Sequence, residues 1–142
     1  MKRLFLLGLC SAVFTAPLIA ATDSEVAARK TVLDLAGAFT NDGFKLRDGN
    51  FTGTIHPKDH VLLQVNLYTG NQYWFSVGAN DKAKKLTVTI FDETGKVVTS
   101  EPYQDEGKAA AGFSPQVSGP YYIRIEETEG EPADFCLIYS YK

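Results

Sequence analysis

The hydrophobic pattern of this chain changes its period near residue 51, and this change constrains the fold more than any other feature. Between residues 22 and 39, apolar side chains recur at helical spacing, whereas from residue 51 onward they alternate with polar ones. Turn-forming residues interrupt the alternation roughly every 8 to 12 positions. Seven or eight short strands at this spacing predict an all-β fold, an antiparallel β-sandwich of the jelly-roll type with one N-terminal α-helix.

The helix is predicted from Thr22 to Phe39. Its apolar stripe consists of Ala28, Val32, Leu35 and Phe39, with Ala36 beside it. N-cap candidates precede the stripe, and a stop signal follows it at Asn41-Asp42-Gly43. Because the stripe is narrow, we expect the helix to pack on a sheet. The helical unit is therefore assigned to residues 22–43 and the sandwich to residues 44–142.

The strands follow from the alternation. The inward-facing sets are Val61, Leu63, Val65 and Leu67; Tyr73, Phe75 and Val77; Leu86, Val88 and Ile90; and Tyr121, Ile123 and Ile125. Residues 92–95 predict a hairpin turn, with a return strand that begins at Val97-Val98. The polar and small residues 101–112 predict a loop, and residues 126–134 predict an acidic turn before a last strand over residues 135–141.

Residues 1–21 predict a secretory signal peptide, with Lys2 and Arg3 before an apolar stretch over residues 4–19 and a cleavage site at Ala20-Ala21. A membrane anchor is disfavoured, because the stretch is shorter than the roughly 20 residues that span a bilayer. Leu9 before Cys10 argues against lipidation. The sequence thus predicts a periplasmic or secreted protein that does not span a membrane.

Cleavage after residue 21 would leave 12 basic and 17 acidic side chains, a net charge of −5. This acidic balance disfavours nucleic acid as a partner. Cys136 would be the only remaining cysteine, so no disulfide within the chain is expected, and we predict that it is buried in the last strand.

Three segments carry a resemblance to a known family. Their residues are Leu67, Gly70, Tyr73, Phe75 and Val77; Leu86, Val88, Ile90, Asp92 and Gly95; and Phe113-Ser114-Pro115 followed by residues 118–125. In order and spacing they are similar to the bacterial pre-peptidase C-terminal (PPC) domain, a β-sandwich appended to many secreted peptidases. The resemblance covers roughly residues 50–142 and implies a non-catalytic module. Some members of that family resemble carbohydrate- or collagen-binding modules, and some use calcium at acidic loops.

The sequence predicts no enzyme. It has no nucleophile elbow, no zinc-protease motif and no glycine-rich phosphate loop after a strand. His56 and His60 flank an aspartate, but Pro57 makes a helix that would bring them together improbable, so no metal site is expected there. A nucleophilic cysteine would have to be Cys136, which we expect to be inert in the last strand.

Calcium is the one cofactor that the sequence leaves open. Acidic residues fall in successive loops, and Asp81 and Asp92 are weak candidates for ligands. No dense run of alternating aspartates supports a dedicated site. Asp92 is more simply explained as a turn residue that bonds its own backbone.

Aromatic residues are the better indication of function. Strand parity places Trp74 opposite the inward set of its strand, and Tyr122 opposite Tyr121 and Ile123. An outward face with Trp and Tyr can stack on sugar rings or anchor a protein. Alternatively the N-terminal helix covers Trp74, and we favour this interpretation.

These observations predict a secreted or periplasmic binding module without catalytic activity. Its ligand would be a glycan or an envelope protein. A structural or assembly subunit of an envelope complex is the alternative, and a small hydrolase without a recognisable motif ranks third. The oligomeric state is left open.

Overall fold

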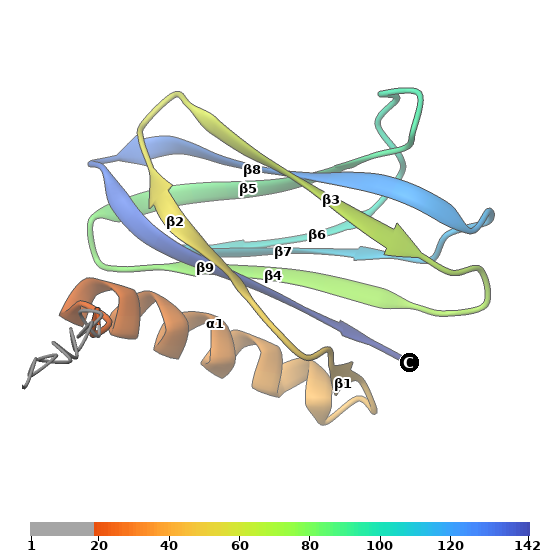
Figure 1. The fold of residues 1–142 in the computed structure, drawn as a ribbon, viewed down its shortest axis with the longest axis horizontal. Helices are drawn as coiled ribbons and strands as arrows, with labels where there is room; N and C mark the ends of the chain where they lie inside the picture. The colour runs from red at the N-terminus through yellow and green to blue at the C-terminus, as the bar shows by residue number, and fades with distance from the viewer. Residues whose placement is uncertain (1–18) are drawn as a thin grey trace, which may run out of the picture.

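The computed structural model describes residues 19–142, so all but the end of the predicted signal peptide lies outside the described residues (Figure 1). The described part contains one helix and nine strands, which are α1 (Asp23–Thr40), β1 (Lys45–Leu46), β2 (Phe51–Ile55), β3 (His60–Leu67), β4 (Tyr73–Ala79), β5 (Ala83–Phe91), β6 (Glu101–Asp105), β7 (Lys108–Phe113), β8 (Gly119–Gly130) and β9 (Ala133–Tyr141).

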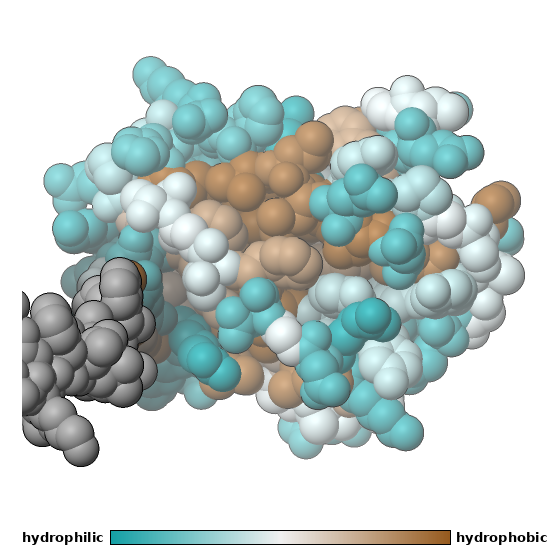
Figure 2. Space-filling view, in the orientation of Figure 1, coloured by the Kyte–Doolittle hydropathy of each residue, from teal (hydrophilic) through white to brown (hydrophobic). Residues whose placement is uncertain are grey.

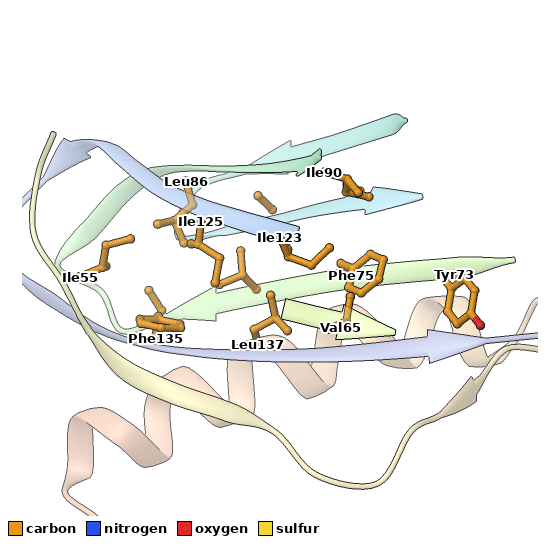
Figure 3. Packing of buried hydrophobic residues seen from close by; sticks show 14 of the residues in the cluster. Ile55, Val65, Tyr73, Phe75, Leu86, Ile90, Ile123, Ile125, Phe135 and Leu137 are labelled. Carbon is orange, nitrogen blue, oxygen red and sulfur yellow. The ribbon is translucent and has the colours of Figure 1, made fainter. Parts of the chain in front are cut away.

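The strands form two packed antiparallel sheets, which confirms the predicted β-sandwich. One sheet has the order β3-β8-β5, and the other runs β1-β9-β4-β7-β6 with β2 also paired to β9. The side chains predicted to face inward meet between the sheets, and Phe75, Ile123 and Leu137 are fully buried there (Figure 3). This apolar layer supplies most of the driving force for folding.

Helix α1 begins with a capping box. The Thr22 side chain accepts a hydrogen bond from the Glu25 amide at 3.2 Å, and the Glu25 carboxylate accepts one from the Thr22 amide at 2.8 Å. Asn41 caps the other end. The observed bounds agree with the predicted ones to within one residue, because local capping chemistry and the apolar period both act within the helix.

The helix lies along the outer face of the six-stranded sheet, below β9 and β4 in Figure 1. Its buried stripe of Ala28, Val32 and Ala36 packs against Cys136 and Ile138. Small residues on the sheet allow a close approach: a Cβ atom built on Gly78 would lie 2.5 Å from the backbone nitrogen of Val32. The helix backbone therefore rests almost directly on the backbone of β4.

The prediction of a loop over residues 101–112 is wrong, because these residues form the β6–β7 hairpin. Strand β7 is buried on both sides, with Ala109 and Ala111 in the sandwich core and Ala110 facing the other way. A strand covered on both faces shows no alternation of polar and apolar residues, so its sequence resembles a loop of small residues.

Two strand boundaries also differ from the predictions. Val97 makes only a single bridge to Phe91, so no return strand follows the turn at residues 92–95. Strand β8 continues through the predicted acidic turn as far as Gly130. There its acidic residues face a basic partner, since Glu129 pairs with Lys85 of β5, and opposite charges across a ladder stabilise a strand that intrinsic propensity disfavours.

Cys136 of β9 is fully buried, as predicted, and it lies between the sheet and α1. Burial raises the pKa of its thiol, with the charge of Arg29 opposing this effect. In a Cys10→Ser background we expect a thiol reagent to label native Cys136 at least about 100-fold more slowly than the denatured chain. Labelling at equal rates in the two states would contradict the burial.

Candidate functional site

The side chain of Trp74 packs against helix α1. Its indole stacks on the Phe39 ring with the centroids 4.3 Å apart and the planes 10° apart. Across the ladder Trp74 pairs with Gly112, where an added Cβ would lie 2.9 Å from the indole. Of the two interpretations of Trp74, the one in which α1 covers it is confirmed.

Tyr122 lies on the other sheet and on the opposite side of the molecule. Strand β8 is the middle strand of the three-stranded sheet, and the side chain of Tyr122 points away from the core. The structure therefore does not bring Trp74 and Tyr122 together. Sequence parity gives the direction of each side chain correctly, but it does not tell which sheet the strand joins.

The outer face of the three-stranded sheet is not covered by any described helix or strand, and we call it the open face. It carries His60, Leu62, Gln64, Thr87, Thr89, Phe91, Tyr122, Arg124 and Glu126. The register places Tyr122 between Gln64 and Phe91, and places Arg124 between Leu62 and Thr89. A shallow hollow of about 470 Å³ is lined by His60, Leu62, Phe91, Tyr122 and Arg124 of this face, together with Glu93, Thr94 and Gly95 of the following turn.

Arg124 is held in place at the centre of this face. Its guanidinium carbon lies 5.1 Å from the centroid of the Phe91 ring, and a terminal nitrogen lies 3.5 Å from a carboxylate oxygen of Glu126. The Nε atom is buried without a hydrogen-bond partner. A planar guanidinium that is already oriented loses little entropy when it binds a carboxylate or carbonyl group. The sequence analysis did not select Arg124 or Phe91, although both share the outward parity of Tyr122.

The turn after β5 fixes the rim of the hollow. One carboxylate oxygen of Asp92 accepts hydrogen bonds from the Thr94 amide (2.9 Å), the Thr94 hydroxyl (2.6 Å) and the Lys96 amide (3.0 Å). The Thr94 hydroxyl and the Lys96 amide lower the pKa of Asp92. The role of Asp92 as a turn residue is confirmed, and these hydrogen bonds fix the turn that carries Glu93 and Thr94.

The calcium candidates are separated by the length of β5, because Asp81 precedes this strand and Asp92 follows it. Asp81 lines a different hollow together with Glu106 and two basic residues, Lys30 and Lys84. His56 lies in a turn, with Lys58 at a φ of 64°, and His60 begins β3. Within residues 19–142 no three potential metal ligands gather at one place.

Glu127 is a feature that the sequence analysis missed. It continues the inward parity of β8 and is fully buried, and neither of its carboxylate oxygens has a hydrogen-bond partner among the described residues. Burial raises the pKa of this carboxyl, and the positive charge of His56 opposes the increase. No sequence pattern marks Glu127, since it stands in an acidic stretch that is typical of an exposed turn.

Comparison with known proteins does not assign this chain to a family. No family model matches the chain, and no curated protein matches it. Among solved structures, PliG of Aeromonas hydrophila, a periplasmic inhibitor of g-type lysozyme, aligns with a TM-score of 0.47 and 13% identity over 66% of this chain and 85% of PliG. A de novo designed double-stranded β-helix aligns with a TM-score of 0.39 and 16% identity, over 64% and 97% of the two chains.

Similarity at this level supports no inference about binding. The resemblance to the PPC domain stays a prediction. In the described part of the chain no helix is both long and apolar enough to cross a membrane.

Proposed function

We propose that this chain is a non-catalytic binding protein of the periplasm or the cell exterior, and that the open face binds a protein. The observation that carries the proposal is Leu62, which is 54% exposed beside the oriented Arg124 and the half-buried Tyr122. Tyrosine and arginine are enriched among the residues that dominate protein interfaces. A PPC-like module would have the same non-catalytic character.

The aromatic rings favour a protein over a glycan. Stacking on a sugar needs a free ring face, but the guanidinium of Arg124 lies over one face of Phe91 and the Phe39 ring lies over one face of Trp74. A sugar at the open face would therefore have to stack on Tyr122. The open face instead combines an apolar side chain, a fixed cation and hydroxyl groups. This combination suits a protein surface that offers an apolar side chain and a carboxylate.

A site-specific photo-cross-linker at Thr89, in the middle of the open face, tests the proposal. In the native host we expect it to capture a protein that the same cross-linker at Tyr103 does not capture, because Tyr103 is an exposed residue of β6 in the other sheet. With the captured protein purified, Arg124→Ala and Tyr122→Ala should each weaken binding by about 30-fold or more, as central interface residues do.

Tyr103→Ala is the matched control and should leave the affinity unchanged. Circular dichroism of each variant verifies that the sandwich stays folded. Unchanged affinity in both open-face variants would contradict the proposal. Binding to a glycan array that is lost in Tyr122→Ala would replace the protein partner with a sugar.

A further inference from the structure

Strand β3 has a free edge. Its eight residues pair with β8 on one side, and no other strand of the described chain pairs with them. In Figure 1, β3 runs along the near side of the three-stranded sheet. Every second residue of such a strand presents a backbone N–H and C=O group to the solvent, which is a template for another strand.

The other long sheet edges are blocked. The free edge of β5 accepts hydrogen bonds from its own chain, including one from the Val98 amide to the Ile90 carbonyl (3.0 Å) and one from the Gln104 amide group to the Leu86 carbonyl (2.6 Å). Strand β6 carries Pro102 together with the charges of Glu101 and Asp105.

Strand β2 is five residues long, with Gly53 at its centre. By contrast β3, with the sequence HVLLQVNL, has no proline, lysine, arginine or acidic residue. It therefore lacks the features with which sheet proteins protect a free edge.

The core beneath this edge is incompletely covered. Val61 and Leu63 face the core but are only half-buried, whereas their ladder partners Ile125 and Ile123 on β8 are fully buried. Figure 2 shows apolar residues gathered across the middle of the view, where β3 crosses in Figure 1. A strand added beside β3 would bring further apolar side chains against Val61 and Leu63.

We propose that β3 pairs antiparallel with β3 of a second copy of this chain, so that two three-stranded sheets become one sheet of six strands. A two-fold axis restricts the register, because side chains that oppose each other must point to the same face. Among the registers that meet this condition, the two with the longest overlap of the strands place the axis at Leu63 or at Gln64. The first register pairs Leu63 with itself and Val61 with Val65, and the second pairs Leu63 with Val65.

A second copy suits this edge better than an unrelated strand does. Both registers set apolar residues against apolar residues on the core side without requiring any pattern from another protein. The chain carries a net charge of −3, so two copies repel each other on average. Strand β3 has no lysine, arginine or acidic residue, so two β3 strands can pair without placing like charges opposite each other. The pairing also places two open faces side by side on one continuous surface.

Sedimentation equilibrium of the purified chain tests the dimer. We expect a dimer at micromolar concentration, and a double variant Leu62→Lys and Gln64→Lys should weaken it by about 100-fold or more, because either register sets like charges opposite each other. Val97→Lys with Tyr103→Lys is the matched control, since it adds the same charge at exposed positions away from β3. It should leave the dimer intact.

Single cysteines identify the contact in a Cys10→Ser background. Oxidation should link two copies through Leu63→Cys or through Gln64→Cys, whichever lies on the axis, and not through Tyr103→Cys. A chain that is still monomeric at a protein concentration of about 100 µM, which is about 100-fold above the expected dissociation constant, would overturn the proposal. A dimer that survives the lysine substitutions in β3, or a different protein's strand bound at β3 of a monomer, would overturn it as well. All these measurements use the purified chain without the proposed partner, so the dimer result does not depend on whether that partner exists.

Discussion

Gly78→Ala is expected to lower the free energy of unfolding by about 2 kcal/mol, the cost typical of an overpacked contact. The new Cβ would lie 2.5 Å from the Val32 nitrogen and 3.0 Å from the carbonyl carbon of Thr31, so α1 would have to move away from the sheet. Backbone atoms of a helix cannot rotate aside as a side chain does. Urea unfolding monitored by circular dichroism measures the loss. Trp74, the only tryptophan, should at the same time shift its emission to longer wavelength, because its stacking partner Phe39 moves with the helix.

Gly37→Ala is the matched control for this prediction. The same substitution is made on the helix itself, where an added Cβ would meet nothing within 4 Å. Alanine in place of an exposed helical glycine should raise the free energy of unfolding by about 0.5 to 1 kcal/mol. The two variants are thus expected to change the free energy of unfolding in opposite directions. Equal effects would mean that the helix does not rest on β4.

Glu127→Gln is expected to stabilise the protein at neutral pH by about 1 to 3 kcal/mol, because a buried carboxylate without a partner costs free energy whenever it is charged. The pKa of Glu127 in the folded chain is raised, so its destabilising effect appears as the pH rises above the unfolded value of about 4.3 and is complete above the folded value. The gain should therefore be largest at pH 7 and should vanish near pH 4. Chemical denaturation at both pH values measures it.

Glu129→Gln controls for the loss of one negative charge on the same strand. Glu129 is exposed and its charge faces only the exposed Lys85 across the ladder, so replacing it should lower the free energy of unfolding by less than about 0.5 kcal/mol. Destabilisation by Glu127→Gln at pH 7 would show that the carboxylate has a stabilising partner in solution. Glu127→Met adds a further test, because it should stabilise the chain at both pH values if the site is dry.

Much of the fold could be predicted because its elements are periodic. The helix over residues 23–40 and the strands around Phe75, Ile90 and Ile123 each have one buried face, so the sequence alternates with the matching period. Strand β7 could not be predicted, since burial on both faces removes the alternation. The end of β8 was missed because cross-strand partners, which a local pattern does not contain, hold its acidic residues in the sheet.

The candidate site was only partly predictable. Parity identifies Tyr122 as outward, but its neighbours Phe91 and Arg124 become a group only when β5 and β8 pair. Whether an outward aromatic residue is covered depends on tertiary packing, and this separates Trp74 under the helix from Tyr122 on the open face. Long-range pairing therefore decides which outward residues can bind.

The place of β9 in the fold bears on how the chain is made. This strand follows all the other described elements in the sequence, yet it pairs with β1, β2 and β4 and lies against α1, and the Ser24 hydroxyl at the start of the helix donates to Asp134. Synthesis runs from the N-terminus, so the larger sheet cannot be completed, and α1 cannot pack on it, until β9 has left the ribosome. Contacts between such distant segments also form slowly. We therefore expect the larger sheet and the seating of α1 to form only after β9 has been synthesised.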